Sequence, residues 1–207
     1  MSEQRQIPCY CDNLVEIEVP EEVDLASDPE AERSIREGSF LSVLCPKCGK
    51  LLKPEFPVRI LDSRAGIELF LIPELERGSF LLGKSAYRLR DPQQGRIVIG
   101  YPELVEKLAI LREGLDDRVV ETIKFYLDQK AQSDESLQIL FRAKSGDKLV
   151  FHLMGLRKDE VGISNIPFSL YETIQRELAT RLTQEPFDLL LAPPYVSYQK
   201  AGPEAAE

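Results

Sequence analysis

Four cysteines in two close pairs constrain the fold of this chain more than any other feature. Cys9 and Cys11 form the first pair, and Cys45 and Cys48 form the second after a long insert. Four thiolates hold a zinc ion tetrahedrally, at about 2.3 Å, when two such chain segments meet. The spacing therefore predicts one four-cysteine zinc site, and it predicts that the site is structural.

The second pair gives the stronger signal, because it lies in the sequence Cys-Pro-Lys-Cys-Gly. Pro46 bends the turn, and Gly49 permits the positive φ with which backbone N–H groups point at the sulfurs. The first pair, Cys-Tyr-Cys, forms a tighter loop, so fewer backbone geometries bring both sulfurs to one ion. The chain has no further cysteine that could complete the site.

Other interpretations of the cysteines stay open. Cys45 and Cys48 could form a redox dithiol, although such pairs typically follow a thioredoxin-like βαβ context, and none precedes this pair. The four residues could be a relic that binds no metal. A catalytic zinc would need an open coordination position and usually a nearby His or Glu. The sequence does not distinguish zinc from iron.

Charge and apolar content limit the class of protein. The 207 residues carry a net charge of -9, which disfavours nucleic acid and anionic membranes as partners. The N-terminus has no apolar signal region, and runs such as 69–73 and 189–194 are far shorter than the roughly 20 residues that span a bilayer. We expect a cytoplasmic protein, in which cysteines serve as metal ligands more often than as disulfides.

The first half of the chain has clear strand and helix signals. Residues 14–19 alternate apolar and polar side chains, which predicts a strand. Residues 27–38 predict a short helix with Asp28 as N-cap, Pro29 in the first turn and Gly38 as the stop. Further strands are predicted at 40–44, 58–61, 67–72, 87–89 and 96–99.

The second half combines helices with a second group of strands. Helices are predicted from Pro102 to Arg112 and from Asp116-Asp117 onward, as an antiparallel hairpin. Strands follow at 137–142 and 148–154. A last helix is predicted from Ser169, which forms a capping box with Glu172.

These elements predict an α+β fold: an N-terminal zinc-ribbon-like β unit with an inserted helix, a helical hairpin, and a small α+β C-terminal part. The expected boundaries are a domain at 1–130, with the ribbon unit at 5–75 and the hairpin at 102–130. A small domain follows at 137–198. A disordered tail is expected at 199–207.

Several of these segments resemble the CpXC domain family. They are Cys45-Pro-Lys-Cys-Gly, the helix beginning Asp28-Pro29-Glu30 with Gly38-Ser39-Phe40, Pro54-Glu55-Phe56-Pro57, and residues 115–121. The resemblance covers roughly residues 5–130. This bacterial and archaeal family is named for two Cys-Pro-x-Cys motifs, whereas the first motif here lacks the proline and one residue. The resemblance implies metal ligation by Cys9, Cys11, Cys45 and Cys48, and it implies no catalytic residue.

Candidates outside the cysteines are weaker. His152, the only histidine, lies in a predicted strand without a nucleophile motif nearby. Asp116 and Asp117 point about 100° apart on a helix, so capping explains them better than paired acid–base chemistry. Lys84 to Arg90 mixes basic residues with Tyr87, and the simplest interpretation is a strand with a basic outer face.

Two classes of function follow. The first is a non-enzymatic interaction module, in which zinc is the scaffold and an acidic surface meets a protein partner. The second is an enzyme with its site in the C-terminal half, around His152, Tyr171 or Tyr195. A zinc ribbon that binds nucleic acid through residues 84–90 is a weaker alternative. The sequence predicts no oligomeric state.

Overall fold

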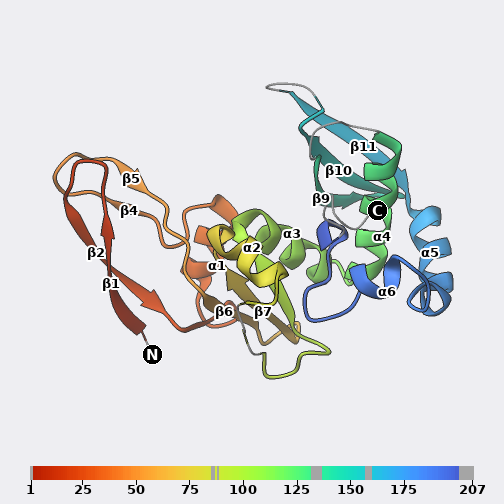
Figure 1. The fold of residues 1–207 in the computed structure, drawn as a ribbon, viewed down its shortest axis with the longest axis horizontal. Helices are drawn as coiled ribbons and strands as arrows, with labels where there is room; N and C mark the ends of the chain where they lie inside the picture. The colour runs from red at the N-terminus through yellow and green to blue at the C-terminus, as the bar shows by residue number, and fades with distance from the viewer. Residues whose placement is uncertain (1, 85–86, 88, 132–136, 157–159, 201–207) are drawn as a thin grey trace. The chain divides into compact units, whose positions relative to one another are not determined.

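The protein has an α+β fold, as predicted (Figure 1). The computed structural model describes residues 2–84, 87, 89–131, 137–156 and 160–200. Residues 1–105 and 106–207 form two compact units, and the division falls within helix α3 (Gly100–Arg112). None of the helices that these residues form combines the length and apolar character needed to cross a membrane.

Two β-hairpins carry the cysteine pairs in the first unit (Figure 1). β1 (Ser2–Pro8) pairs antiparallel with β2 (Leu14–Pro20), whose Val15, Ile17 and Val19 are buried as the alternation predicted. β4 (Val43–Leu44) pairs with β5 (Leu51–Leu52) in the second hairpin. The predicted strand at 40–44 is wrong at its start, because Leu41 has a φ of 56° and turns the chain.

Helix α1 (Pro29–Glu37) lies between these hairpins in the sequence and confirms its predicted ends. The Asp28 carboxylate accepts a hydrogen bond from the Ala31 N–H at 2.9 Å, and Gly38 takes the left-handed conformation that ends the helix. Ala31 and Ile35 form the buried face of this amphipathic helix. Local sequence therefore determines both ends of α1.

A four-stranded sheet forms the centre of the first unit. Its order is β3-β6-β7-β8, with strands β3 (Glu22–Asp24), β6 (Val58–Asp62), β7 (Ile67–Ile72) and β8 (Arg96–Ile99). β7 and β8 are parallel, and η1 (Glu74–Glu76) and α2 (Arg77–Leu81) lie in the connection between them. This helical segment was not predicted from the sequence.

The predicted strand at 87–89 is wrong for Tyr87 and Leu89, which lie in no strand. Residue 88 lies outside the described residues. Tyr87 instead contacts the Phe70 ring, and its hydroxyl donates to the Glu76 carboxylate. Arg90 pairs with Glu22 at 2.6 Å. Acidic neighbours therefore engage these members of the predicted basic face.

Helix α4 (Asp117–Ala131) opens with two aspartates that behave differently. Asp116 caps the helix, because its carboxylate accepts the Arg118 N–H at 3.0 Å. Asp117 is buried and pairs with Lys107 of α3 at 3.1 Å. Capping therefore explains Asp116, whereas Asp117 belongs to a buried ion pair between α3 and α4.

A three-stranded antiparallel sheet completes the second unit, in the order β11-β10-β9. β9 (Gln138–Ser145) and β10 (Lys148–Met154) were predicted, and β11 (Val161–Pro167) was missed. Buried side chains of this sheet pack with α4 and α5 in one core; among them are Ile139, Phe141, Leu149, Phe151, Val120, Ile123, Ile174 and Leu178.

Helix α5 (Phe168–Arg181) corrects the predicted capping box. Pro167 precedes the helix, no side chain caps it, and Ser169 lies inside its first turn. The helix begins directly at the end of β11, because the Phe168 N–H bonds to the Asp147 carbonyl beside the strand. The predicted box therefore did not set this helix start.

The last described residues are ordered. α6 (Phe187–Leu190) and η2 (Tyr198–Lys200) end the second unit, so Gln199 and Lys200 do not belong to the predicted disordered tail. Residues 201–207 lie outside the described residues. The division of the chain at 1–130 and 137–198 stays a prediction.

Candidate metal centre

The second cysteine pair lies in the turn between β4 and β5. The Cys45 N–H bonds to the Lys50 carbonyl at 2.9 Å, and the Gly49 N–H bonds to the Cys45 carbonyl at 2.8 Å. Gly49 has a φ of 70°, as the sequence predicted. This closed turn directs the Cys45 and Cys48 side chains to the same side of the hairpin.

Backbone amides of this turn change the acidity of its thiols. Burial would raise the pKa of Cys45, but the N–H groups of Cys48 and Lys47 donate to its sulfur and lower the pKa to about 6. The Lys50 N–H has the same lowering effect on Cys48, but the neighbouring Cys11 and Cys9 thiols raise its pKa to about 12. Because the four sulfurs are close together, one thiolate disfavours the ionisation of its neighbours. A bound cation would neutralise this charge and allow all four thiols to ionise.

The first cysteine pair lies in the turn between β1 and β2, which is one residue shorter. The Cys9 N–H bonds to the Asn13 carbonyl at 2.9 Å, and the Asp12 N–H bonds to the Cys9 carbonyl at 2.9 Å. Asp12 has a φ of 61° and stands where Gly49 stands in the other turn, directly after the second cysteine. Aspartate tolerates this left-handed conformation better than most residues, so the shorter motif still forms a knuckle-like turn.

The two turns bring the four sulfurs together. The Sγ atoms of Cys9 and Cys48 lie 3.6 Å apart, those of Cys11 and Cys45 lie 3.7 Å apart, and all four lie within 4.8 Å of one another. Sulfurs at about 2.3 Å from a tetrahedral metal are about 3.8 Å apart, whereas a disulfide holds them at about 2.0 Å. The four thiols are free, and their spacing fits a metal ion.

Few other groups surround the sulfurs. Cys9 and Cys45 are buried in a small cluster with Val15 and Leu52, and Cys48 is exposed. The Asn13 amide lies 3.8 Å from the Cys45 sulfur and donates to it. Among the described residues, no other group of three or more His, Cys, Asp or Glu side chains is placed to hold a metal ion.

Two of the residues named for an enzyme site in the C-terminal half, His152 and Tyr171, lie on different faces of one sheet. His152 is half-buried on β10, on the opposite face from Phe151 and Leu153, which lie in the core. Tyr171 lies in that core, and its hydroxyl accepts the Asp116 N–H at 2.8 Å. The sheet therefore separates His152 from Tyr171, and the buried Tyr195 lies in the segment before η2.

The titratable groups that do cluster in the second unit form ion pairs. Lys124 pairs with Glu106 at 2.8 Å and with Glu121 at 3.1 Å, and Lys107 lies 3.6 Å from Glu121. Burial alone would lower the pKa of Lys124, but the two carboxylates raise it above its usual value. Burial also raises the pKa of Glu106. This network was not predicted, because in the sequence each of its residues resembles an ordinary charged position on a helix.

Comparison with known proteins agrees with this geometry. The model of the CpXC family, described as CpXC protein, matches residues 7–124, which include all four cysteines. The chain belongs to the CpXC family. An uncharacterized protein of Treponema pallidum (strain Nichols) is 30% identical over 220 residues, covering 97% of this chain and 99% of the relative. No solved structure matches the chain.

Two residues outside the cysteine motif, Asp12 and Asn13, also shape the first turn. Asp12 supplies its left-handed residue, and Asn13 supplies both a turn carbonyl and an amide directed at a sulfur. Asp-Asn directly after a cysteine pair was the available signal, since both residues favour left-handed and turn conformations.

Proposed function

We propose that this CpXC protein binds one zinc ion through Cys9, Cys11, Cys45 and Cys48, and that the ion is structural. The spacing of the four sulfurs supports this proposal most strongly. Four thiolates fill a tetrahedral site and leave no position for substrate. The ion joins two hairpins whose own buried cluster contains only Cys9, Val15, Cys45 and Leu52.

We further propose that the zinc-bound hairpins form a non-enzymatic protein-interaction module. Four apolar side chains on these hairpins are exposed, with Tyr10 84% accessible: Tyr10, Leu14, Leu44 and Leu51. Leu44 and Leu51 are cross-strand partners, so they lie on one face beside the second turn. Grouped exposed apolar side chains mark interaction surfaces. A reducing cytoplasm, which preserves free thiols, suits this site.

Metal content tests the first part. Protein purified without added metal is expected to contain about one zinc per chain by elemental analysis. Its four thiols should react only after chelation, because the thiolates are bound until then. Iron in that analysis would correct the metal. A metal-free protein with a disulfide between Cys45 and Cys48 would overturn the site and favour redox chemistry.

A matched pair of surface variants tests the second part. Photo-crosslinking in a lysate of the native organism should give protein adducts that Leu44→Lys removes. Leu75→Lys is the control, because Leu75 is 99% exposed on η1, outside the cysteine hairpins. If no adduct depends on Leu44, the interaction proposal fails while the zinc site is unaffected.

A further inference from the structure

The two edges of the β11-β10-β9 sheet differ in whether side chains cover their backbone N–H groups. In an antiparallel sheet, every second residue of an edge strand directs its N–H away from the neighbouring strand. Unpaired edge groups of this kind can bind a strand of another chain. The side chains that approach each edge therefore show which edge is available.

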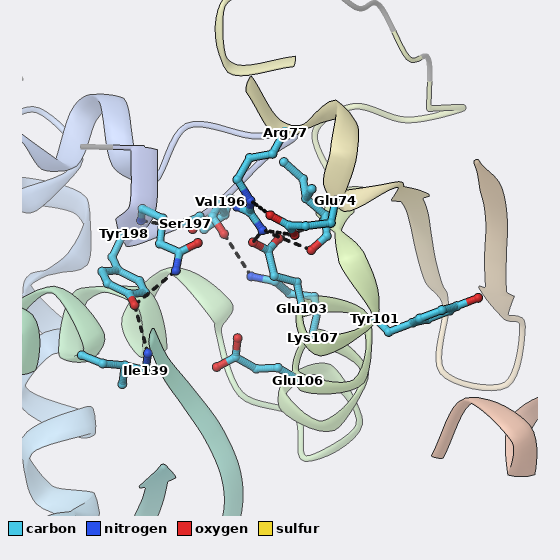
Figure 2. A network of polar contacts seen from close by, with 12 residues as sticks. Glu74, Arg77, Tyr101, Glu103, Glu106, Lys107, Ile139, Val196, Ser197 and Tyr198 are labelled. Atoms are coloured by element: carbon cyan, nitrogen blue, oxygen red, sulfur yellow. Dashed lines mark hydrogen bonds and ion pairs between the residues drawn. The ribbon is translucent and has the colours of Figure 1, made fainter. Parts of the chain in front are cut away.

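The β9 edge is occupied by side chains of the same unit (Figure 2). The Ile139 N–H donates to the Tyr198 hydroxyl at 3.0 Å, and that hydroxyl donates to the Leu137 carbonyl at 2.9 Å. The Phe141 N–H donates to the Glu106 carboxylate. Both acceptor residues are buried, so the N–H groups of Ile139 and Phe141 are unavailable to another chain.

No described residue covers the β11 edge in a comparable way. The Phe168 N–H bonds to Asp147 next to the strand, so alternation directs the N–H groups of Val161, Ile163 and Asn165 outward. Within the part of the chain that the structure describes, these three residues gain no side-chain partner like Glu106 or Tyr198.

The composition of β11 also leaves its edge open. Proteins usually protect an edge strand with charges, proline or a bulge. β11 is seven residues long, reads Val-Gly-Ile-Ser-Asn-Ile-Pro, and has no charge along its length. Its only proline is the last residue, and the sheet's register shift lies on the other side, between β10 and β9. Val161 and Ile163 are 54% and 65% exposed.

We propose that β11 pairs with β11 of a second copy of this chain, antiparallel, across a two-fold axis at Ile163. The three outward donors are symmetric about Ile163, so this register places Val161 opposite Asn165 and Ile163 opposite itself. Each outward donor then meets an outward carbonyl of the other copy. The pair is isologous and joins two sheets of three strands into one of six.

Charge favours a second copy on this edge. The chain carries a net charge of -9, so two copies repel each other overall and a neutral segment is favoured as the contact. β11 is a neutral segment, and like charges do not face each other when it pairs with itself. Pairing also covers Ile163 with its own symmetry mate on the solvent face of the sheet. The partner strand is therefore identified by self-complementarity.

Sedimentation equilibrium of the full chain tests the proposal. The wild type is expected to be a dimer, with twice the 23.5 kDa mass of one chain. Ile163→Lys places two lysines opposite each other, and it should raise the dissociation constant about tenfold or more. Leu140→Lys is the matched control, because Leu140 lies on the same face, across from His152, on the covered β9 strand. It should leave the dimer unchanged.

Two further measurements keep the proposal falsifiable if Ile163→Lys fails to fold. Asn165→Pro removes one outward N–H donor. Like the native Pro167, residue 165 has its backbone nitrogen directed away from β10, so the substitution should weaken the dimer without breaking the hydrogen bonds to β10. In the wild type, amide exchange at Val161, Ile163 and Asn165 should slow as protein concentration rises. A monomeric wild type overturns the proposal. So does a dimer whose three amides exchange freely or that survives both substitutions.

Discussion

The cysteine hairpins and the second unit of the CpXC chain differ in what they bury. Around the sulfurs, the described residues of the hairpins bury a cluster of only four side chains: Cys9, Val15, Cys45 and Leu52. The second unit buries a large apolar core, and it also buries an ion network centred on Lys107 and Lys124. The proposed zinc ion would compensate for the small core, whereas a large core can accommodate buried charges that pair with one another. The two regions should therefore respond to different perturbations.

Loss of one thiolate should have the largest effect. Cys45→Ser is expected to unfold residues 5–60 and leave the helical hairpin folded, because structural zinc contributes on the order of 10 kcal/mol to small domains. Limited proteolysis with mass spectrometry should locate the cuts in the cysteine hairpins. An N-terminal region as resistant as the wild type would show that the hairpins are stable without the ion.

The second unit should be most sensitive to a broken ion pair. Lys124→Met leaves Glu106 and Glu121 without their shared cation, which is expected to reduce the free energy of unfolding by about 3–5 kcal/mol. Urea denaturation measures the change, and Lys130→Met on the exposed face of α4 is the control. Zinc content should not change. Equal effects of the two substitutions would mean that the buried ion pairs do not contribute to the stability of the second unit.

Alkaline pH should change the stability of the second unit through Lys200. Burial, followed by the nearby charge of Lys107, lowers the pKa of Lys200 from 10.5 to about 8. Between about pH 8 and pH 10.5 the unfolded chain binds more protons than the folded one, so the free energy of unfolding rises with pH. Urea denaturation across this range should show a rise that Lys200→Met reduces. Identical pH profiles would contradict the lowered pKa.

The smallest effect should distinguish the two cysteine turns. Gly49→Ala forces a left-handed alanine and should weaken zinc binding by about 1–2 kcal/mol, although no atom lies within 4 Å of the added methyl group. Asp12→Gly should change zinc affinity by only about 0.5 kcal/mol, because aspartate already tolerates that conformation. Competition with a chromogenic chelator measures both. A larger effect at Asp12 would mean that its side chain has a role beyond the turn.

The predictable parts of this fold are those that local chemistry determines. Asp28, Pro29 and Gly38 defined α1, and the alternation of β2 defined its buried face. The spacing of the cysteines predicted that two turns meet at one site, and the structure brings their four sulfurs together. Each of these signals lies within a few residues of the feature that it determines.

The missed parts depend on contacts between distant segments. β11 contains Gly162 and Asn165, which suggest a turn, yet β10 pairs with it along its whole length. Asp117 resembles a capping residue until Lys107, ten residues away, is seen beside it. Ser169 and Glu172 match a capping box, but the end of β11 sets the start of α5. In each case the tertiary partner overrides the local pattern.

The contact between Tyr198 and β9 also has a consequence for the order of synthesis. Tyr198 lies 59 residues downstream of Ile139, so β9 is synthesised long before the hydroxyl that occupies its edge. Until Tyr198 emerges from the ribosome, the Ile139 N–H is exposed, and a nascent β9 can pair with the wrong strand. The edge of β9 therefore lacks this cover while the 59 residues that follow Ile139 are synthesised.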